Sequence, residues 1–241
     1  MPKEKLDTFA QKGGIEFKDV VLRYRPNLPT VLNKLSFKIN AGEKVGIVGR
    51  TAAGKSTMSL ALTRIVEIEA GRINIDGDDI QETTLDNLRD RVTVIPQDPT
   101  LFTGTLRFNI DPRSLHSDEK ILALLNEAGL DKLLEKESSS TEKKGEKEEQ
   151  GDKTGPSDET KKKDDKKAKN ALDMEITERG SNLSSGEKSL ICICRAILRQ
   201  NKVIILDEAT ANIDLQTEIK IQDLITKCFK DCTVLTIAHR L

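Results

Sequence analysis

The chain has 241 residues, which is enough for one large domain or two small ones. Its 39 basic and 40 acidic residues nearly cancel, so the net charge of −1 gives no electrostatic reason to expect binding to nucleic acid or to a membrane surface. No apolar run reaches the roughly 18 residues of a transmembrane helix candidate. The amino terminus also lacks the apolar core of a signal peptide.

In chain order, residues 1–13 are polar and predict a flexible N-terminal linker. Alternating or short apolar runs then predict strands at 14–24, 31–39, 44–48, 71–77, 92–95, 203–206 and 232–237. Helical spacing predicts helices at 57–65, 117–134, 184–199 and 215–229, a helical turn at 85–91, and a short helix or turn at 105–110. Because strands alternate with helices after residue 43, we predict a parallel sheet, with an antiparallel portion at the N-terminus.

One segment has a different composition from the rest. Residues 135–170 hold 11 acidic and 11 basic residues and a single apolar side chain, Ala168. Such a segment buries too little apolar surface to fold, so we predict a disordered charged insertion. Lys and Glu favour helix, which leaves a transient exposed helix as the alternative.

A phosphate-binding P-loop, G-x-x-x-x-G-K-[ST], follows the strand at 44–48. Its eight residues are Gly49-Arg50-Thr51-Ala52-Ala53-Gly54-Lys55-Ser56. The glycines allow a tight turn that points backbone N–H groups at one concavity, and Lys55 adds a point charge for the β- and γ-phosphates. The Ser56 hydroxyl can reach Mg²⁺. A helix from Thr57 onward puts the phosphates at a helix N-terminus, where the dipole favours anions.

A second candidate functional group, a pair of carboxylates, follows the apolar strand at 203–206. Asp207 and Glu208 follow that strand directly, at the end where open α/β sheets bind ligands. Successive residues of a strand point apart, so the two carboxylates serve different purposes. Asp207 suits Mg²⁺, and Glu208 suits a general base that polarises the attacking water.

The four cysteines do not form an obvious metal site. Cys192 and Cys194 lie two apart within a predicted helix, and Cys228 and Cys232 have no second ligand pair. We expect reduced, partly buried thiols, with a metal site or disulfide as the alternative.

A third motif precedes the Asp-Glu pair by about twenty residues. By itself the segment would be a helix N-cap followed by a glycine. Placed between a P-loop and the Asp-Glu strand, it resembles the LSGGQ signature of ATP-binding cassette (ABC) proteins. The matching residues are Leu183, Ser184, Ser185, Gly186 and Glu187.

Further ABC motifs follow in the family's order. Gln97 resembles the Q-loop glutamine, residues 209–214 the D-loop, and His239 the switch histidine. Tyr24 resembles the aromatic residue that stacks on adenine. Residues 177–180 resemble the loop that contacts the transmembrane domain in exporters. The resemblance covers residues 14–241 apart from the insertion.

The resemblance implies an α/β fold: a P-loop NTPase with a RecA-like parallel sheet core, an N-terminal antiparallel β-subdomain and a helical subdomain at about 98–200. It implies ATP and Mg²⁺ as cofactors. The implied catalytic residues are Lys55, Gln97, Glu208 and His239. The implied metal ligands are Ser56, Gln97 and Asp207. The implied nucleotide-binding residues are Tyr24, the P-loop residues 49–56 and Thr57.

The segments 24–29, 42–51 and 96–105 resemble the second cassette of the multidrug-resistance-associated (C) subfamily. This resemblance implies an exporter of organic anions or conjugates at the cytoplasmic face of a membrane. Its partners would be a first cassette on the same full-length chain and the transmembrane domains, with no nucleic acid. A regulatory or gating cassette and a non-transport ABC ATPase are the alternatives.

Three departures from the family pattern stand out. Ala52 replaces the usual glycine, and its β-carbon would be strained if the position needs a positive φ. Glu187 puts a carboxylate near a polyphosphate, which should weaken capping unless it points away or finds a cation. The chain stops at Leu241, where family members continue, so we expect a fragment of a longer protein.

Overall fold

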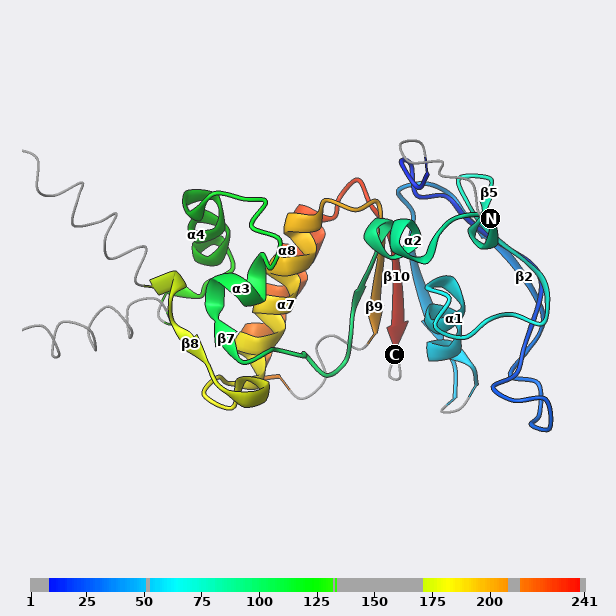
Figure 1. The fold of residues 1–241 in the computed structure, drawn as a ribbon, viewed down its shortest axis with the longest axis horizontal. Helices are drawn as coiled ribbons and strands as arrows, with labels where there is room; N and C mark the ends of the chain where they lie inside the picture. The colour runs from blue at the N-terminus through cyan, green and yellow to red at the C-terminus, as the bar shows by residue number, and fades with distance from the viewer. Residues whose placement is uncertain (1–8, 51–52, 132, 134–170, 208–212, 239–241) are drawn as a thin grey trace, which may run out of the picture. The chain divides into compact units, whose positions relative to one another are not determined.

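The computed structural model describes residues 9–50, 53–131, 133, 171–207 and 213–238 (Figure 1). They form two compact units. The first contains the described residues up to Asp98 with those of 199–211 and 225–241; the second contains Pro99–Leu198 with those of 212–224. The predicted insertion at 135–170 lies outside the described residues. Among those that are described, no helix is both long and apolar enough to cross a bilayer.

Sheet A of the first unit is antiparallel, as predicted for the N-terminal part of the chain. Its order is β2-β1-β4-β5. The strands are β1 (Ile15–Leu22), β2 (Leu32–Ile39), β4 (Ala70–Ile75) and β5 (Asp78–Asp79). Sequence patterns predicted the three longer strands, whereas the two residues of β5 are too few to show a period.

A β-bulge interrupts the alternation of β1. The buried positions are Ile15, Phe17, Val20 and Leu22, so one step of the pattern is three residues long. Asp19 adopts a positive φ of 47°, and its N–H donates to Ser36 Oγ at 2.8 Å. The bulge turns Val20, rather than a charged neighbour, toward the core.

Sheet B of the first unit is parallel, which confirms the parallel sheet predicted for the chain after residue 43. Its order is β3-β10-β9-β6. The strands are β3 (Lys44–Val48), β6 (Val92–Ile95), β9 (Val203–Asp207) and β10 (Thr233–Ala238). The first four residues of β9 are fully buried, as expected for a central strand covered on both faces. In a parallel sheet all four carboxyl ends lie at one edge.

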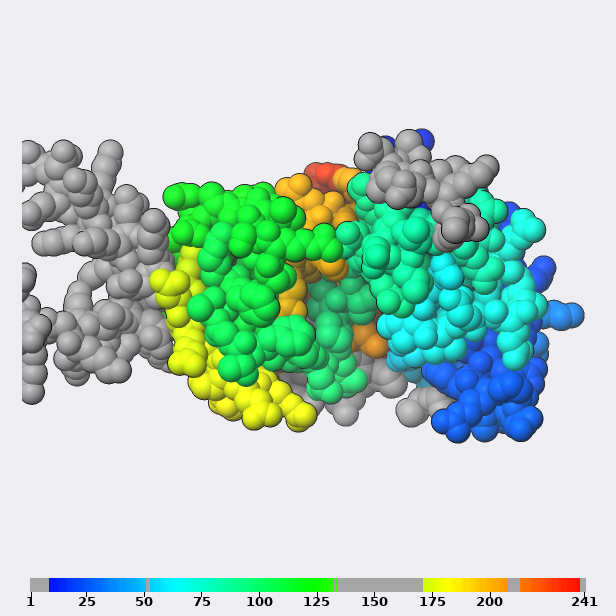
Figure 2. All heavy atoms as spheres, in the orientation of Figure 1, coloured from blue at the N-terminus to red at the C-terminus, as the bar shows by residue number. Residues whose placement is uncertain are grey.

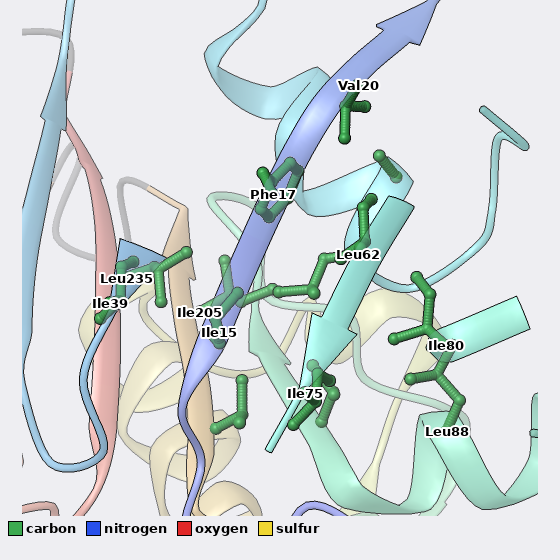
Figure 3. Packing of buried hydrophobic residues seen from close by; sticks show 14 of the residues in the cluster. Ile15, Phe17, Val20, Ile39, Leu62, Ile75, Ile80, Leu88, Ile205 and Leu235 are labelled. Atoms are coloured by element: carbon green, nitrogen blue, oxygen red, sulfur yellow. The ribbon is translucent and has the colours of Figure 1, made fainter. Parts of the chain in front are cut away.

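One hydrophobic cluster joins both sheets with the helices of the first unit. These helices are α1 (Lys55–Leu62), η1 (Ile80–Glu82) and α2 (Leu85–Arg91). Figure 3 shows Ile15 and Phe17 of β1 in this cluster with Leu62 of α1, Ile205 of β9 and Leu235 of β10. Ala61 and Leu62 of α1 belong to this cluster, so the shared core fixes α1 relative to sheet B.

The prediction of a loose segment over residues 1–13 is wrong for residues 9–13. Phe9 and Ala10 are 2% and 3% exposed and belong to the core cluster. The Asp76 carboxylate accepts three consecutive backbone N–H groups, from Lys12 at 2.8 Å, Gly13 at 3.0 Å and Gly14 at 2.7 Å. Polar composition hid this anchor, because it depends on a partner more than sixty residues away. Residues 1–8 lie outside the described part.

The second unit is mainly helical. Its elements are β7 (Gly104–Thr105), α3 (Leu106–Ile110), α4 (Asp118–Glu127), β8 (Glu175–Ile176), η2 (Glu178–Gly180), α7 (Ser185–Arg199) and α8 (Leu215–Cys228), and the last residues of α7 and α8 belong to the first unit. β7 and β8 form a two-residue antiparallel pair, and their segments lie together in green and yellow in Figure 2.

Helix α4 is shorter than predicted. Ser117 caps it as expected, with its Oγ accepting the Lys120 N–H at 3.4 Å. The helix ends at Glu127 instead of continuing to residue 134, because Gly129 adopts a φ of +75° just beyond it. The glycine is therefore a C-terminal stop that apolar spacing alone did not reveal.

Candidate nucleotide-binding site

The P-loop joins β3 to α1 in the predicted strand–loop–helix order. Gly54 is the N-cap of α1 with a φ of +85°, and no side chain caps this end of the helix. A β-carbon at Gly54 would lie 3.2 Å from side-chain atoms of both Leu32 and Val31. Both constraints favour glycine. Because α1 also has no acidic residue in its first turn, its N-terminal N–H groups suit an external anion. Thr51 and Ala52 lie outside the described residues.

Lys55 lies along the inner side of the loop. Its side chain is 5% exposed, and Nζ donates to the carbonyl oxygens of Gly49 at 2.5 Å and Arg50 at 3.0 Å. An ammonium group has three N–H donors. The ammonium is therefore held beside the backbone of the loop, where its charge suits bound phosphates. Ser56 is exposed and Ala53 N–H closes the turn onto Arg50 O at 3.1 Å.

Tyr24 comes two residues after the end of β1 and reaches α1. Its Oη lies 2.9 Å from Thr57 Oγ1, and its side chain is 47% exposed. The phenol is thus fixed at its tip while its ring remains accessible. This arrangement fits an aromatic platform for a nucleobase next to the P-loop.

The strand register of sheet B brings the other predicted residues to the same edge. Ile47 pairs with Ile237, which in turn pairs with Asp207. Asp207 on β9 therefore lies two strands away from Ile47 on β3, and Ile47 is followed by Val48 and the P-loop. On the other side of β9, Ile95 pairs with Leu206, so Gln97 follows two residues beyond the end of β6 at this edge.

The structure therefore groups some of the predicted catalytic and metal residues and leaves others undescribed. Asp207 is the last residue of β9, Gly49 follows β3 directly, and Gln97 lies two residues beyond the end of β6, so all three lie at the same edge of the sheet. Ser56 is the second residue of α1. Glu208 and His239 lie outside the described residues, so their roles stay predictions. Both directly follow strands of this sheet.

The signature segment lies in the second unit, at the start of α7. Leu183 is buried, Ser184 and Ser185 are exposed, and Gly186 is buried. A β-carbon at Gly186 would lie 2.8 Å from Cγ2 of Thr217 on α8. The glycine therefore allows close packing of α7 on α8 as well as any role toward a nucleotide.

Glu187 binds the signature serine. One carboxylate oxygen, Oε2, accepts both the Ser184 N–H and the Ser184 hydroxyl at 2.8 Å, and Ser184 Oγ accepts the Glu187 N–H at 3.3 Å. This reciprocal pair is a capping box, and the spacing S-x-x-E was the signal in the sequence that could have revealed it. The sequence left open where the Glu187 carboxylate points. In the structure it is directed at Ser184 of the same segment.

The start of α8 is capped in a similar way. Asp214, the last residue of the D-loop-like segment, accepts the Thr217 N–H at Oδ1 at 3.0 Å. Hydrogen bonds from the N–H and the hydroxyl of Thr217 lower the pKa of this carboxyl. Residues 209–212 of the segment lie outside the described part of the chain.

Two asparagines that sequence reasoning missed hold the loops of the second unit. Asn109, 1% exposed, bonds Phe102 N and O at 2.8 Å each and Thr105 O at 3.1 Å, and so fixes the loop that follows the Q-loop. Asn182 accepts from Thr177 Oγ1 at 2.9 Å and donates to Glu175 O at 2.9 Å. The second network fixes the loop at 177–180, which resembles the exporter contact.

None of the four cysteines forms a disulfide, which agrees with the expected reduced thiols. Cys192, Cys194 and Cys232 are buried and Cys228 is half-buried. Burial raises the pKa of Cys192 and of Cys232, which favours the neutral thiol over the thiolate that binds metals. Among the described residues, no group of three or more metal-ligating side chains occurs.

Comparisons with known proteins agree with this arrangement. The family described as ABC transporter matches residues 32–211. The chain is 44% identical over 235 residues to the bile pigment transporter 1 of Saccharomyces cerevisiae, covering 98% of this chain and 14% of the relative. It is 46% identical over 231 residues to the ATP-dependent bile acid permease of the same yeast, covering 96% and 13%. Identity to human ATP-binding cassette sub-family C member 3 is 43% over 230 residues, covering 95% and 13%.

A solved structure also matches. A bacterial Atm1-family ABC exporter with ATP bound aligns with a TM-score of 0.76 and 30% identity, over 96% of this chain and 35% of that chain. The coverages of 14% and 13% mean that the chain spans about one seventh of the length of the two yeast relatives. The match over 32–211, the P-loop at the edge of a parallel sheet and the signature at the start of α7 lead to one conclusion: the chain is a nucleotide-binding domain of the ABC transporter family, similar to those of sub-family C.

Proposed function

We propose that this domain binds ATP with Mg²⁺ and hydrolyses it to drive export through the transmembrane domains of a full-length protein, at the cytoplasmic face of a membrane. The register of sheet B carries the proposal, because it brings the P-loop, Gln97 and Asp207 to one edge. Organic anions or conjugates are the proposed cargo. Two yeast relatives are named for bile pigment and bile acid, which supports that class.

The donor atoms at this edge suit magnesium. The Ser56 hydroxyl, the Gln97 amide oxygen and the Asp207 carboxylate are hard oxygen ligands, which Mg²⁺ prefers. The ion would neutralise phosphate charge when bound. Lys55 would bind the β- and γ-phosphates, and Tyr24 would stack on the adenine.

Glu208 and His239 complete the proposed chemistry. Glu208 would accept a proton from the attacking water, and His239 would donate a hydrogen bond to the γ-phosphate. Phosphoryl transfer needs mainly positioning and charge neutralisation. A set of residues that follows the ends of neighbouring parallel strands meets that need.

The complete site requires a second cassette. We propose that the P-loop of this chain is closed by the signature of a first cassette, as in the second cassette of a sub-family C protein. The signature of this chain, Leu183 to Glu187, would cap the nucleotide on the P-loop of the first. Gln97 and the loop at 177–180 would transmit closure to the transmembrane domains.

The test is ATP turnover in the full-length protein reconstituted in liposomes. Lys55→Ala should abolish labelling of this site by a photoreactive ATP analogue, and Glu208→Gln should retain labelling but stop hydrolysis. Glu175→Gln changes an exposed carboxylate on β8 and serves as the control for a loss of charge. Near-parental hydrolysis by Glu208→Gln, or unchanged labelling of Lys55→Ala, would contradict the proposal.

A regulatory or gating cassette is the second candidate. One observation favours it: Glu187 accepts both hydrogen bonds that the signature serine donates. This would weaken one of the two proposed composite sites. The same reconstitution separates the candidates. A gating cassette would change conductance or partner activity on ATP binding even with Glu208→Gln in place.

A further inference from the structure

In the signature segment of this chain, the carboxylate of Glu187 is hydrogen-bonded to Ser184. Glu187 Oε2 lies 2.8 Å from both Ser184 N and Ser184 Oγ, so one carboxylate oxygen accepts both of the donors that Ser184 offers. The hydroxyl cannot donate to a second acceptor at the same time, because it has a single O–H group.

The carboxylate of Glu187 has no cationic partner among the residues that the structure describes: no Lys, Arg or His of these lies within ion-pair distance of it. The neighbouring Lys188 instead lies beside Gly180, where a β-carbon would meet its Cε at 3.3 Å. The negative charge therefore remains at the start of α7, where the helix dipole favours it.

We propose that Glu187 lowers the affinity of this signature for ATP, because its carboxylate competes with the γ-phosphate for the hydrogen bonds of Ser184. The inference rests on the proposed function, in which Ser184 faces a nucleotide held by a first cassette. Closure then has to release the Ser184 hydroxyl from Glu187, and it brings a carboxylate next to a polyphosphate. Both effects weaken the capping of ATP at that site.

Glutamine at this position would act differently. Its amide oxygen still accepts the Ser184 N–H and so keeps the helix cap, but a neutral acceptor is roughly half as strong as a carboxylate. The amide also carries no charge to repel phosphate. Glu187→Gln therefore removes the competition without removing the cap.

The test uses the full-length protein, a photoreactive Mg·ATP analogue and proteolysis that separates the two cassettes. We measure retention of the probe on the P-loop of the first cassette after dilution. Glu187→Gln should lengthen retention about tenfold, equivalent to about 1.4 kcal/mol. Glu175→Gln, the same charge change on an exposed residue of the same unit, should leave it unchanged. A gain in retention cannot arise from damage to the fold.

A double-mutant cycle with Ser184→Ala separates the two proposals. Ser184→Ala should shorten retention, and in its background Glu187→Gln should lose most of its effect. If Ser184→Ala shortens retention while Glu187→Gln does not lengthen it, the competition is refuted and the composite site stands. If Ser184→Ala has no effect on the first cassette, the composite site itself is refuted, and the inference with it.

Discussion

The hydroxyl of Tyr24 lies 2.9 Å from the hydroxyl of Thr57, so the aromatic side chain beyond β1 is tied to the first turn of α1. The two residues belong to the two parts of the proposed site that recognise the base and the phosphates. The bond fixes the tip of a side chain that is 47% exposed. Two variants separate its contribution from that of the ring.

Tyr24→Phe retains the ring and loses only the hydrogen bond. We expect ATP affinity to fall two- to fivefold, since one such bond contributes about 0.5–1 kcal/mol. Tyr24→Ala also removes the stacking surface, and stacking on a base is worth about 1–3 kcal/mol. Titration with a fluorescent ATP analogue measures both. Equal affinities for the Phe and Ala variants would show that the ring does not contact the base.

Gly186→Ala should destabilise the packing of α7 on α8. The new β-carbon would lie 2.8 Å from Thr217 Cγ2, and overpacking of this kind costs about 1–3 kcal/mol. Thr217→Ser removes Cγ2 but keeps the hydroxyl that bonds Asp214. The double variant should therefore recover most of the free energy of unfolding measured with urea. No recovery would mean that Gly186 is needed for another reason.

Asp76→Asn should loosen the segment that precedes β1. Oδ1 of Asp76 accepts the Gly14 N–H and Oδ2 accepts the Lys12 N–H. In asparagine an NH₂ group replaces one of these oxygens, so it would face a backbone N–H that it cannot accept. Leaving buried donors unsatisfied costs about 1–3 kcal/mol. Hydrogen exchange at Gly13 and Gly14 should speed up selectively. Asp78→Asn, on the next strand, provides the matched control, and equal acceleration in both variants would count against the anchor.

Deletion of residues 137–168 should leave the folded domain intact. Leu133 and Ala171, on either side of the charged insertion, are 6% and 4% exposed, so the packed surface ends close to the segment. The melting temperature should change by less than about 2 °C, which corresponds to under 1 kcal/mol at this size. A large fall would show that the insertion packs against the domain after all.

The longer elements could be predicted from the sequence, because burial of one face imposes a period and burial of both faces, as in β9, gives a continuous apolar run. All three longer strands of sheet A and all four of sheet B were expected, and so was the helix after Lys55. Features set by distant partners could not be predicted. Two-residue strands β7 and β8 pair across seventy residues, and Phe9 is buried by contacts that its polar neighbours do not suggest.

The candidate site shows the same division. The P-loop and Asp207 could be predicted from local motifs, because phosphate and metal binding need particular residue types at fixed positions. The signature was predicted only through its resemblance to the ABC family, since alone it would be a helix N-cap followed by a glycine. The anchoring of Tyr24 by Thr57 depends on how β1 and α1 pack, which no local pattern encodes. The engagement of Ser184 by Glu187 was within reach of the sequence, since a capping box is a local motif.

The strand order β3-β10-β9-β6 has a consequence for biosynthesis. β10 lies between the strand that leads into the P-loop and the strand that carries Asp207, yet it is the last of the four to be translated. Gly42 N–H, next to β3, bonds Thr233 Oγ1 across 191 residues. At about 5–20 residues per second, the ribosome needs about 10–40 s to supply that partner. β9 is translated shortly before β10, so β3 has no partner strand in sheet B for almost the whole interval. The two halves of the phosphate site come together only when β10 is inserted between β3 and β9.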